Sequence, residues 1–92
     1  MYDLRMTSRY SKSYKKMRKR GLDMSLLDNV VDLLRCGEML PAKYKDHALT
    51  GKYKGFRECH IKPDWLLIYA INEEILILVL SDTGTHADLF GM

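Results

Sequence analysis

The 92-residue sequence contains few cysteines and no long apolar run. Its two cysteines, Cys36 and Cys59, are too few for a disulfide framework, so we expect reduced thiols in a cytoplasmic protein. The apolar run Ile75–Leu80 has six residues, whereas a membrane-spanning helix needs ~20. The polar, basic N-terminus also lacks the apolar stretch of a secretory signal. We therefore expect neither a secreted disulfide-rich domain nor a membrane protein.

Phosphate-binding glycine loops and compact metal motifs are missing as well. Gly51 and Gly55 are too sparse to form a phosphate-binding loop. Neither cysteine has an activating neighbour, so a thiol nucleophile is not expected. We therefore expect no cofactor. A metal-dependent hydrolase remains an alternative, because the chain contains the residue types that bind zinc, although their spacing matches no compact zinc motif: His47, His60, Asp64 and His86.

The composition is that of one globular domain spanning residues 1–92, with 47% hydrophobic and 29% charged residues. The formal net charge of +3 is unevenly distributed, because residues 1–20 carry eight Lys or Arg against one Asp. This local excess predicts a polyanion or an acidic protein as partner. A solvated helix face is the alternative interpretation of the same charges.

The sequence pattern of the N-terminal third predicts a strand followed by two helices. Alternating apolar residues indicate a short strand over residues 2–6. Apolar residues at i, i+4 and i+7 indicate a narrow-faced basic helix over residues 8–20. A wider apolar band predicts a second helix from Asp23 or Ser25 to about Cys36. Joined by a tight turn, the two helices form an αα-hairpin.

The rest of the chain predicts a loop and three strands. Residues 38–55 show no sustained periodicity and indicate a long loop with room for a small hairpin. Alternating or continuously apolar segments predict strands over residues 55–61, 65–71 and 75–80. Their short connections indicate an antiparallel meander. The predicted class is α+β, with the helices packed on one face of the sheet.

The three histidines are the strongest indication of acid–base catalysis in the sequence. If the last three strands form a meander, His60 and Asp64 lie close together, and His86, just past the final strand, approaches them. Together with His47 they suit RNA phosphodiester cleavage, which needs a base for the 2′-OH and an acid for the leaving 5′-oxygen. Taken singly, each histidine is more often structural or plain surface.

Cations and aromatic rings in the same region predict substrate contacts. Basic side chains stabilise the charge that develops on the phosphate, and aromatic rings stack on unpaired bases. The candidate cations are Lys45, Lys52, Lys54 and Arg57, and the candidate stacking residues are Trp65, Tyr69 and Phe90.

Several linked motifs carry a family resemblance over nearly the whole chain. The stretch YKDHALTGKYKGFRECHIKPDWLLIY, followed by TGTHADLF, resembles the YafQ branch of the RelE-like bacterial toxins of type II toxin–antitoxin systems. The resemblance implies an mRNA endonuclease that cuts transcripts in the ribosomal A site without a metal and leaves a 2′,3′-cyclic phosphate. It also implies a cognate antitoxin as partner, with operator DNA contacted only through the toxin–antitoxin complex.

The resemblance also implies roles for particular residues. His47, His60, Asp64 and His86 match the proposed catalytic residues of the family, and Phe90 matches its C-terminal aromatic residue. We expect His86 and Asp64 to transfer protons, and His47 and His60 to orient the scissile phosphate and stabilise charge. The basic helix gains a role in contacting ribosomal RNA, through Lys12, Lys15, Lys16, Arg18, Lys19 and Arg20.

The sequence departs from the family pattern at two positions. Asp82 stands where the family commonly has an arginine, and Ala48 stands where a proline often follows the histidine. The first change removes a cation that would stabilise the phosphate. The alternative function is therefore a non-catalytic module that binds the antitoxin and acts with it on operator DNA.

Overall fold

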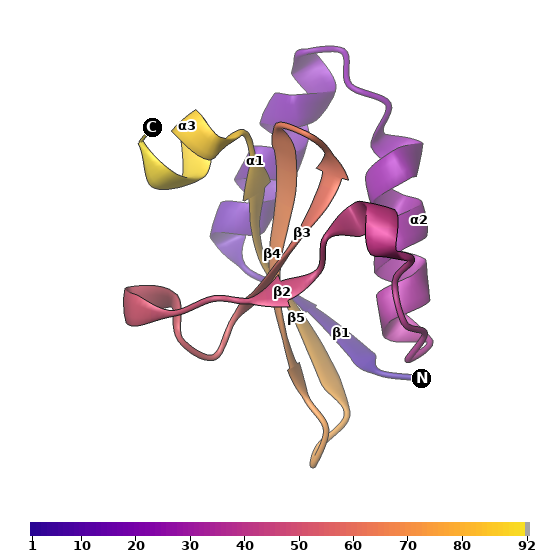
Figure 1. Cartoon of the computed structure of the whole chain (residues 1–92). Helices are drawn as coiled ribbons and strands as arrows, with labels where there is room; N and C mark the ends of the chain where they lie inside the picture. Colours follow the sequence, from indigo (N-terminus) through magenta and orange to yellow (C-terminus); the bar gives the residue numbers. More distant parts are fainter. Residues whose placement is uncertain (92) are drawn as a thin grey trace.

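The computed structural model describes residues 1–91, and its fold is the predicted α+β class, with two helices covering one face of a sheet (Figure 1). The elements, including the single-turn 3-10 helices η1 and η2, are β1 (Asp3–Met6), α1 (Ser8–Lys19), α2 (Met24–Arg35), η1 (Ala42–Tyr44), β2 (His47–Ala48), η2 (Gly51–Tyr53), β3 (Arg57–Lys62), β4 (Trp65–Asn72), β5 (Ile77–Gly84) and α3 (His86–Phe90). Within the described residues, no helix has the length and apolar character needed to cross a membrane.

The sheet has five strands in the order β1-β5-β4-β3-β2. Strands β3, β4 and β5 form the predicted antiparallel meander, and β1 pairs in parallel with β5 at one edge. At the other edge β2 pairs with the start of β3, which is the small hairpin allowed for in the predicted loop.

One strand boundary near the C-terminus was predicted wrongly, and one helix there was not predicted. The last strand begins at Ile77 rather than Ile75, because the Asn72 side chain accepts hydrogen bonds from the backbone N–H groups of Glu74 and Ile75 and extends the turn. Ile75 is consequently 63% exposed. Residues 86–90, for which no element was predicted, form α3, which Thr85 caps by accepting the N–H of Asp88.

The core lies between the helices and the sheet. Thr7 caps α1 and Asp23 caps α2, each through a side-chain oxygen, so both helices begin close to where the sequence predicted. The buried side chains of the two helices pack on Cys59, Leu67 and Leu78 of the sheet. Burial raises the pKa of the Cys59 thiol to about 12, which makes it an unreactive core residue.

The strand register determines where the functional side chains meet. Leu66 of β4 pairs with His60 on one side and with Gly84 on the other. Glu58 pairs with His47 of β2. Because successive strand residues point to opposite faces, Glu58 and His60 lie on the face away from the helices while Cys59 faces the core. This face therefore carries the side chains of β2, β3 and the segment after β5.

Candidate active site

The structure brings the three histidines together on this face. The ring centroids of His47 and His60 are 6.3 Å apart, and those of His60 and His86 are 5.8 Å apart. One ring comes from β2, one from β3 and one from the first turn of α3. All three are at least partly exposed, so a substrate can reach them.

His86 and Asp64 form a hydrogen-bonded pair. The backbone N–H of His86 donates to Asp64 Oδ1 at 2.9 Å, and His86 Nδ1 lies 2.6 Å from the same oxygen. These two hydrogen bonds, the backbone one foremost, lower the pKa of Asp64, so this carboxyl is ionised at neutral pH and accepts. Nδ1 of His86 therefore carries the hydrogen, and Nε2 remains for chemistry.

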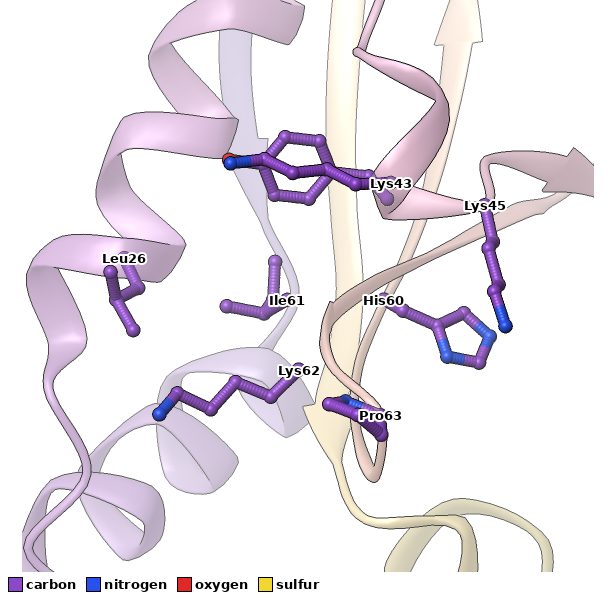
Figure 2. A pocket seen from close by; sticks show the side chains of 8 residues that line it. Leu26, Lys43, Lys45, His60, Ile61, Lys62 and Pro63 are labelled. Atoms are coloured by element: carbon purple, nitrogen blue, oxygen red, sulfur yellow. The ribbon is translucent and has the colours of Figure 1, made fainter.

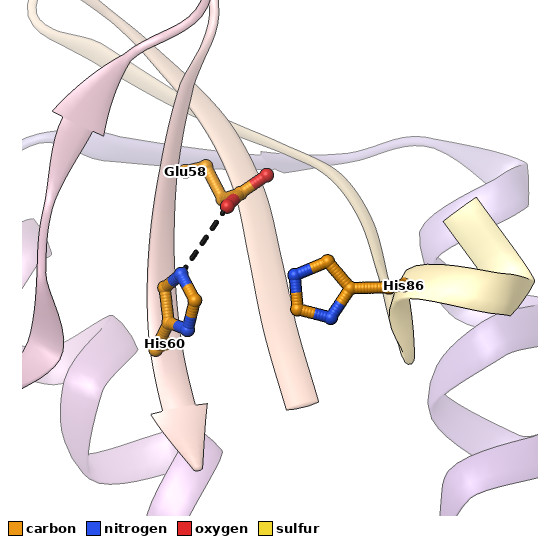
Figure 3. A group of neighbouring side chains, drawn as sticks. All are labelled: Glu58, His60 and His86. Atoms are coloured by element: carbon orange, nitrogen blue, oxygen red, sulfur yellow. Dashed lines mark ion pairs between the residues drawn. The ribbon is translucent and has the colours of Figure 1, made fainter. Parts of the chain in front are cut away.

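Glu58 is a site residue that the sequence-based prediction missed. Its side chain is 7% exposed, and its Oε1 lies 3.4 Å from Nε2 of His60 and 3.7 Å from Nε2 of His47. Figure 3 shows Glu58 and His60 side by side on β3, with the ring of His86 facing them from the start of α3. Strand alternation places Glu58 on the same face as His60, and this was the signal in the sequence. It was missed because acidic residues in strands are usually exposed to solvent.

His47 is also held in one orientation. Its Nδ1 lies 2.7 Å from the carbonyl oxygen of Lys45. A carbonyl can only accept, so Nδ1 is the donor and Nε2 is directed to Glu58. Lys45, exposed and predicted as a substrate contact, adopts a left-handed backbone conformation with φ of 50°. The turn at Lys45 thus shapes the loop that carries His47.

An aromatic and basic group lies beside the histidines. The rings of Tyr53 and Phe90 meet edge to face with centroids 5.5 Å apart. Lys52 Nζ lies 5.4 Å from the centroid of the Tyr53 ring, and Lys54 is exposed just after η2. Phe90 is one helical turn from His86, so both project from neighbouring positions of α3. Tyr53 was not among the predicted stacking residues.

Trp65 and Tyr69 were predicted to stack on bases, and the structure corrects both assignments. Trp65 is 3% exposed and donates its indole N–H to Thr83 Oγ1 at 3.0 Å. Tyr69 is 1% exposed, and its hydroxyl donates to Asp46. Both residues lie in the apolar core between sheet and helices, so neither ring is available to a nucleobase.

Arg57, a predicted phosphate contact, does not join the histidines. It precedes Glu58 on β3 and therefore faces the opposite side of the sheet, where its Nη2 donates to Asp46 Oδ2 at 3.1 Å. Asp46 thus binds Arg57 with one oxygen and Tyr69 with the other. Because Asp46 immediately precedes His47, this network holds β2 against β3 and positions the His47 ring.

Two of the predicted RNA contacts, Lys16 and Arg20, instead support the helix that carries His86. Arg20 forms two hydrogen bonds with Asp88, at 2.7 and 3.0 Å, and Lys16 lies 3.6 Å from the same carboxylate. The hydrogen bond from Arg20 is the main reason that the pKa of Asp88 lies well below its usual range. The contact fixes α3 and hence His86. The remaining predicted RNA contacts, Lys12, Lys15, Arg18 and Lys19, are exposed along α1.

Asp82 has a structural partner. Its Oδ1 accepts the hydroxyl of Ser13 at 2.6 Å and the backbone N–H of Thr83 at 2.9 Å. The side chain therefore ties α1 to β5. At this position the chain has an acid held by hydrogen bonds where a cation was expected from the family pattern.

Three site residues have the chemistry and spacing of metal ligands. Glu58, His60 and His86 each offer one ligand atom, and these atoms lie within 4.8 Å of one another. Two imidazoles and a carboxylate are a common set for zinc. The same side chains thus suit either proton transfer or a divalent cation.

Comparisons with known proteins agree with this geometry. The family model described as bacterial toxin of type II toxin–antitoxin system, YafQ, matches residues 2–91. The mRNA interferase toxin YafQ of Escherichia coli K12 is 44% identical over 90 residues, covering 97% of this chain and 96% of the relative.

Two kinds of solved structure are also similar. YafQ in the E. coli DinJ–YafQ complex superposes with a TM-score of 0.90 at 41% identity, covering 99% of this chain and all of that one. A metal-bound toxin from Helicobacter pylori gives a TM-score of 0.91 at 42% identity, covering 98% of this chain and all of that one. The chain therefore belongs to the YafQ family of toxins of bacterial type II toxin–antitoxin systems.

Proposed function

We propose that this protein is an endoribonuclease that cleaves mRNA in the ribosomal A site by metal-independent acid–base catalysis. The observation that carries the proposal is the His86–Asp64 pair, whose ring faces His60 and Glu58 across the site. The name of the E. coli relative, an mRNA interferase, supports mRNA as the substrate.

The proposed reaction is an attack of the RNA on its own backbone. A base removes the proton of a 2′-OH, and the oxygen forms a bond to the adjacent phosphorus. The bond from phosphorus to the 5′-oxygen breaks as an acid donates a proton to that oxygen. The products are a 2′,3′-cyclic phosphate and a 5′-hydroxyl, so the step consumes no water.

The geometry supports a division of roles. His86 exchanges a proton through Nε2, because Nδ1 is held by Asp64. Asp64 was predicted to share in proton transfer, but its place behind the ring and its lowered pKa favour an orienting role. His60 lies across from His86 and takes the complementary proton transfer, while His47 orients and stabilises the scissile phosphate.

The proposed partners are an antitoxin, the ribosome and mRNA. A relative of the same fold forms the DinJ–YafQ toxin–antitoxin complex, which supports a cognate antitoxin that neutralises this chain. Operator DNA would be contacted through that complex. The exposed cations of α1 are suited to ribosomal RNA, because phosphate contacts give affinity without base specificity. Lys52, Tyr53 and Phe90 would contact the mRNA.

A metal-dependent version of the same cleavage is the second candidate. The Glu58, His60 and His86 cluster and the metal-bound H. pylori relative both favour it. A divalent cation held by these three residues would supply positive charge next to the phosphate. His47 would still position the RNA, and Asp64 would orient His86 as a ligand.

Cleavage of an mRNA on programmed ribosomes tests the proposal. We expect cleavage on ribosomes but not of free mRNA, unchanged by EDTA, with 2′,3′-cyclic phosphate ends. His86→Ala should lower the rate by roughly 100-fold or more, whereas Glu74→Gln on the exposed β4–β5 turn should not. Loss of activity in EDTA with stoichiometric bound metal would favour the metal-dependent reaction. No cleavage by the folded, antitoxin-free protein would favour the non-catalytic module.

A further inference from the structure

A hollow of about 300 Å³ opens beside His60, between η1, α2 and the end of β3 (Figure 2). Of the histidine cluster, only His60 lines this hollow. His47, Glu58 and His86 lie outside it. The lining residues are Leu26, Lys43, Tyr44, Lys45, His60, Ile61, Lys62 and Pro63.

The walls combine an apolar surface with a cationic rim. Leu26 and Tyr44 are half-buried and Ile61 is buried, and all three pack against the core. The ammonium group of Lys43 lies 5.2 Å from the centroid of the Tyr44 ring. Figure 2 shows Lys43 and Lys62 extending on the same side as Leu26, above and below Ile61. A flat apolar group could therefore lie on this surface with cations at both ends.

The charge of the hollow is uncompensated. No carboxylate lines it, and among residues 1–91 none of Lys43, Lys45 and Lys62 lies within ion-pair distance of an acid. The pKa of Asp23 is lowered chiefly by hydrogen bonds from Ser25. The charge of Lys62 makes a smaller contribution in the same direction. Unpaired cations around a concave surface favour an anionic ligand.

The hollow adjoins the proposed reaction centre across the free edge of β3. Strand β2 covers only the start of β3, at Arg57 and Glu58. From His60 to Lys62 the outer edge of β3 is therefore free of β2, and His60 stands at the boundary between hollow and histidine cluster. The His60 ring and Ile61 point to opposite faces of the sheet, so a strand of RNA with its scissile phosphate at His60 would reach the hollow by passing around this free edge (Figure 2).

We infer that this hollow is a subsite for one nucleotide of single-stranded RNA that flanks the cleaved bond. The base would lie on Tyr44, Leu26 and Ile61. Lys43 and Lys62 would bind the adjoining phosphates. An aromatic and apolar floor with a lysine rim is the combination that single-stranded RNA sites use. The inference rests on the proposed function, and it makes the hollow a site that positions the nucleotide next to the cut.

Nuclear magnetic resonance titration with an uncleavable RNA tests the subsite. The probe is the trinucleotide UpUpU with 2′-O-methyl groups, which block the attacking oxygen, added to ¹⁵N-labelled protein at low salt. We expect shifts of the backbone amides of Leu26, Tyr44 and Ile61. Inorganic phosphate and uridine, added separately, should each bind more weakly.

A matched pair of variants separates the subsite from general charge. Lys43→Gln/Lys62→Gln should weaken trinucleotide binding about tenfold and lower the salt dependence. Arg5→Gln/Arg9→Gln removes the same charge from exposed positions outside the hollow and should change affinity less than about twofold.

Equal weakening by both double variants would overturn the inference, as would amide shifts confined to His60 and His86. No binding by the wild-type protein at millimolar trinucleotide would also overturn it. The test is independent of ribosomal cleavage. Trinucleotide binding in the hollow without cleavage of mRNA on ribosomes would overturn the proposed function alone, and cleavage without these amide shifts would overturn the subsite alone.

Discussion

At the level of single residues, acceptors fix the histidine rings of the site. Asp64 accepts from Nδ1 of His86, and the carbonyl of Lys45 accepts from Nδ1 of His47. Glu58 lies next to Nε2 of both His47 and His60. Orientation of this kind lowers the entropy that the reaction must lose, because the reacting nitrogens already have a fixed direction.

Trp65 shows how a residue of the right chemistry can serve the fold instead. Its N–H donates to Thr83 Oγ1, and the Thr83 hydroxyl donates in turn to the carbonyl of Leu66 at 2.6 Å. We expect Trp65→Phe to lower the free energy of unfolding by about 1–3 kcal/mol, because a buried acceptor loses its donor. Urea denaturation measures this loss.

The matched variant is Phe90→Leu, since Phe90 lies beside the histidines at the surface. It should reduce cleavage of mRNA on ribosomes while changing the free energy of unfolding by less than about 1 kcal/mol. Trp65→Phe should leave cleavage within about threefold at a temperature where it is folded. Normal stability with lost cleavage in Trp65→Phe would instead make Trp65 a substrate contact.

At the level of elements, α3 is held by a residue distant in sequence, because Arg20 precedes its partner Asp88 by 68 residues. Arg20 at the end of α1 binds Asp88, and Thr85 and Asp88 cap α3 reciprocally. Gly84 allows the close approach, because a Cβ at this position would lie 2.9 Å from Cβ of Asp88. Helix α3, which carries His86, is therefore held in place by the ion pair between Arg20 and Asp88 and by the lack of a side chain at Gly84.

Removing the contact between Arg20 and Asp88 should lower the rate of catalysis. We expect Asp88→Asn to lower the rate of mRNA cleavage about tenfold or more, since small displacements of a reacting group are costly. Single-turnover cleavage on programmed ribosomes measures the rate. Asp3→Asn, an exposed acid on β1, is the control and should have no effect. Equal rates for Asp88→Asn and wild type would contradict the positioning role of Asp88.

The effect on stability should depend on pH in a defined direction. The folded-state pKa of Asp88 lies below its unfolded value of about 3.9. The contact therefore contributes fully to the free energy of unfolding above that pH and is lost as the pH falls through the folded-state pKa. The stability difference between wild type and Asp88→Asn should persist at neutral pH and shrink below about pH 4. A difference that grows on acidification would contradict this assignment.

At the level of the whole molecule, the basic charge of α1 and the histidine cluster occupy different surfaces. The histidines lie on the sheet face away from the helices, whereas the exposed lysines of α1 lie on the helical layer (Figure 1). Under the proposed function, this separation would allow the helical layer to bind ribosomal RNA while the other face receives the mRNA. Lys16 and Arg20 are the exceptions, since they also hold Asp88.

Charge removal from α1 should therefore weaken ribosome binding without changing the site. We expect Lys12→Gln/Lys15→Gln/Lys19→Gln to reduce affinity for ribosomes and to lower the slope of log K against log salt by about 2. Filter binding at several salt concentrations measures both. Arg5→Gln on β1 is the control. Unchanged affinity and slope in the triple variant would exclude α1 as the ribosome contact.

The sequence by itself determined what depends on local pattern. Periodicity and capping residues placed α1 and α2, and short connections predicted the meander. The spacing of linked motifs identified the family and named the histidines that the structure groups together. The start of β5 was predicted wrongly and α3 was not predicted, because a side-chain turn at Asn72 delays the strand and a contact from Arg20 holds the short helix.

Only the tertiary structure decided which side chains lie at the histidine cluster. Arg57 and Glu58 are neighbours in sequence, yet one pairs with Asp46 beside the core and the other lies among the histidines. Trp65 and Tyr69 have the chemistry of stacking residues, but the layer of helices buries both. Burial and pairing arise from residues that are distant along the chain and close in space, so they follow from the packing of the sheet against its helices and not from local sequence.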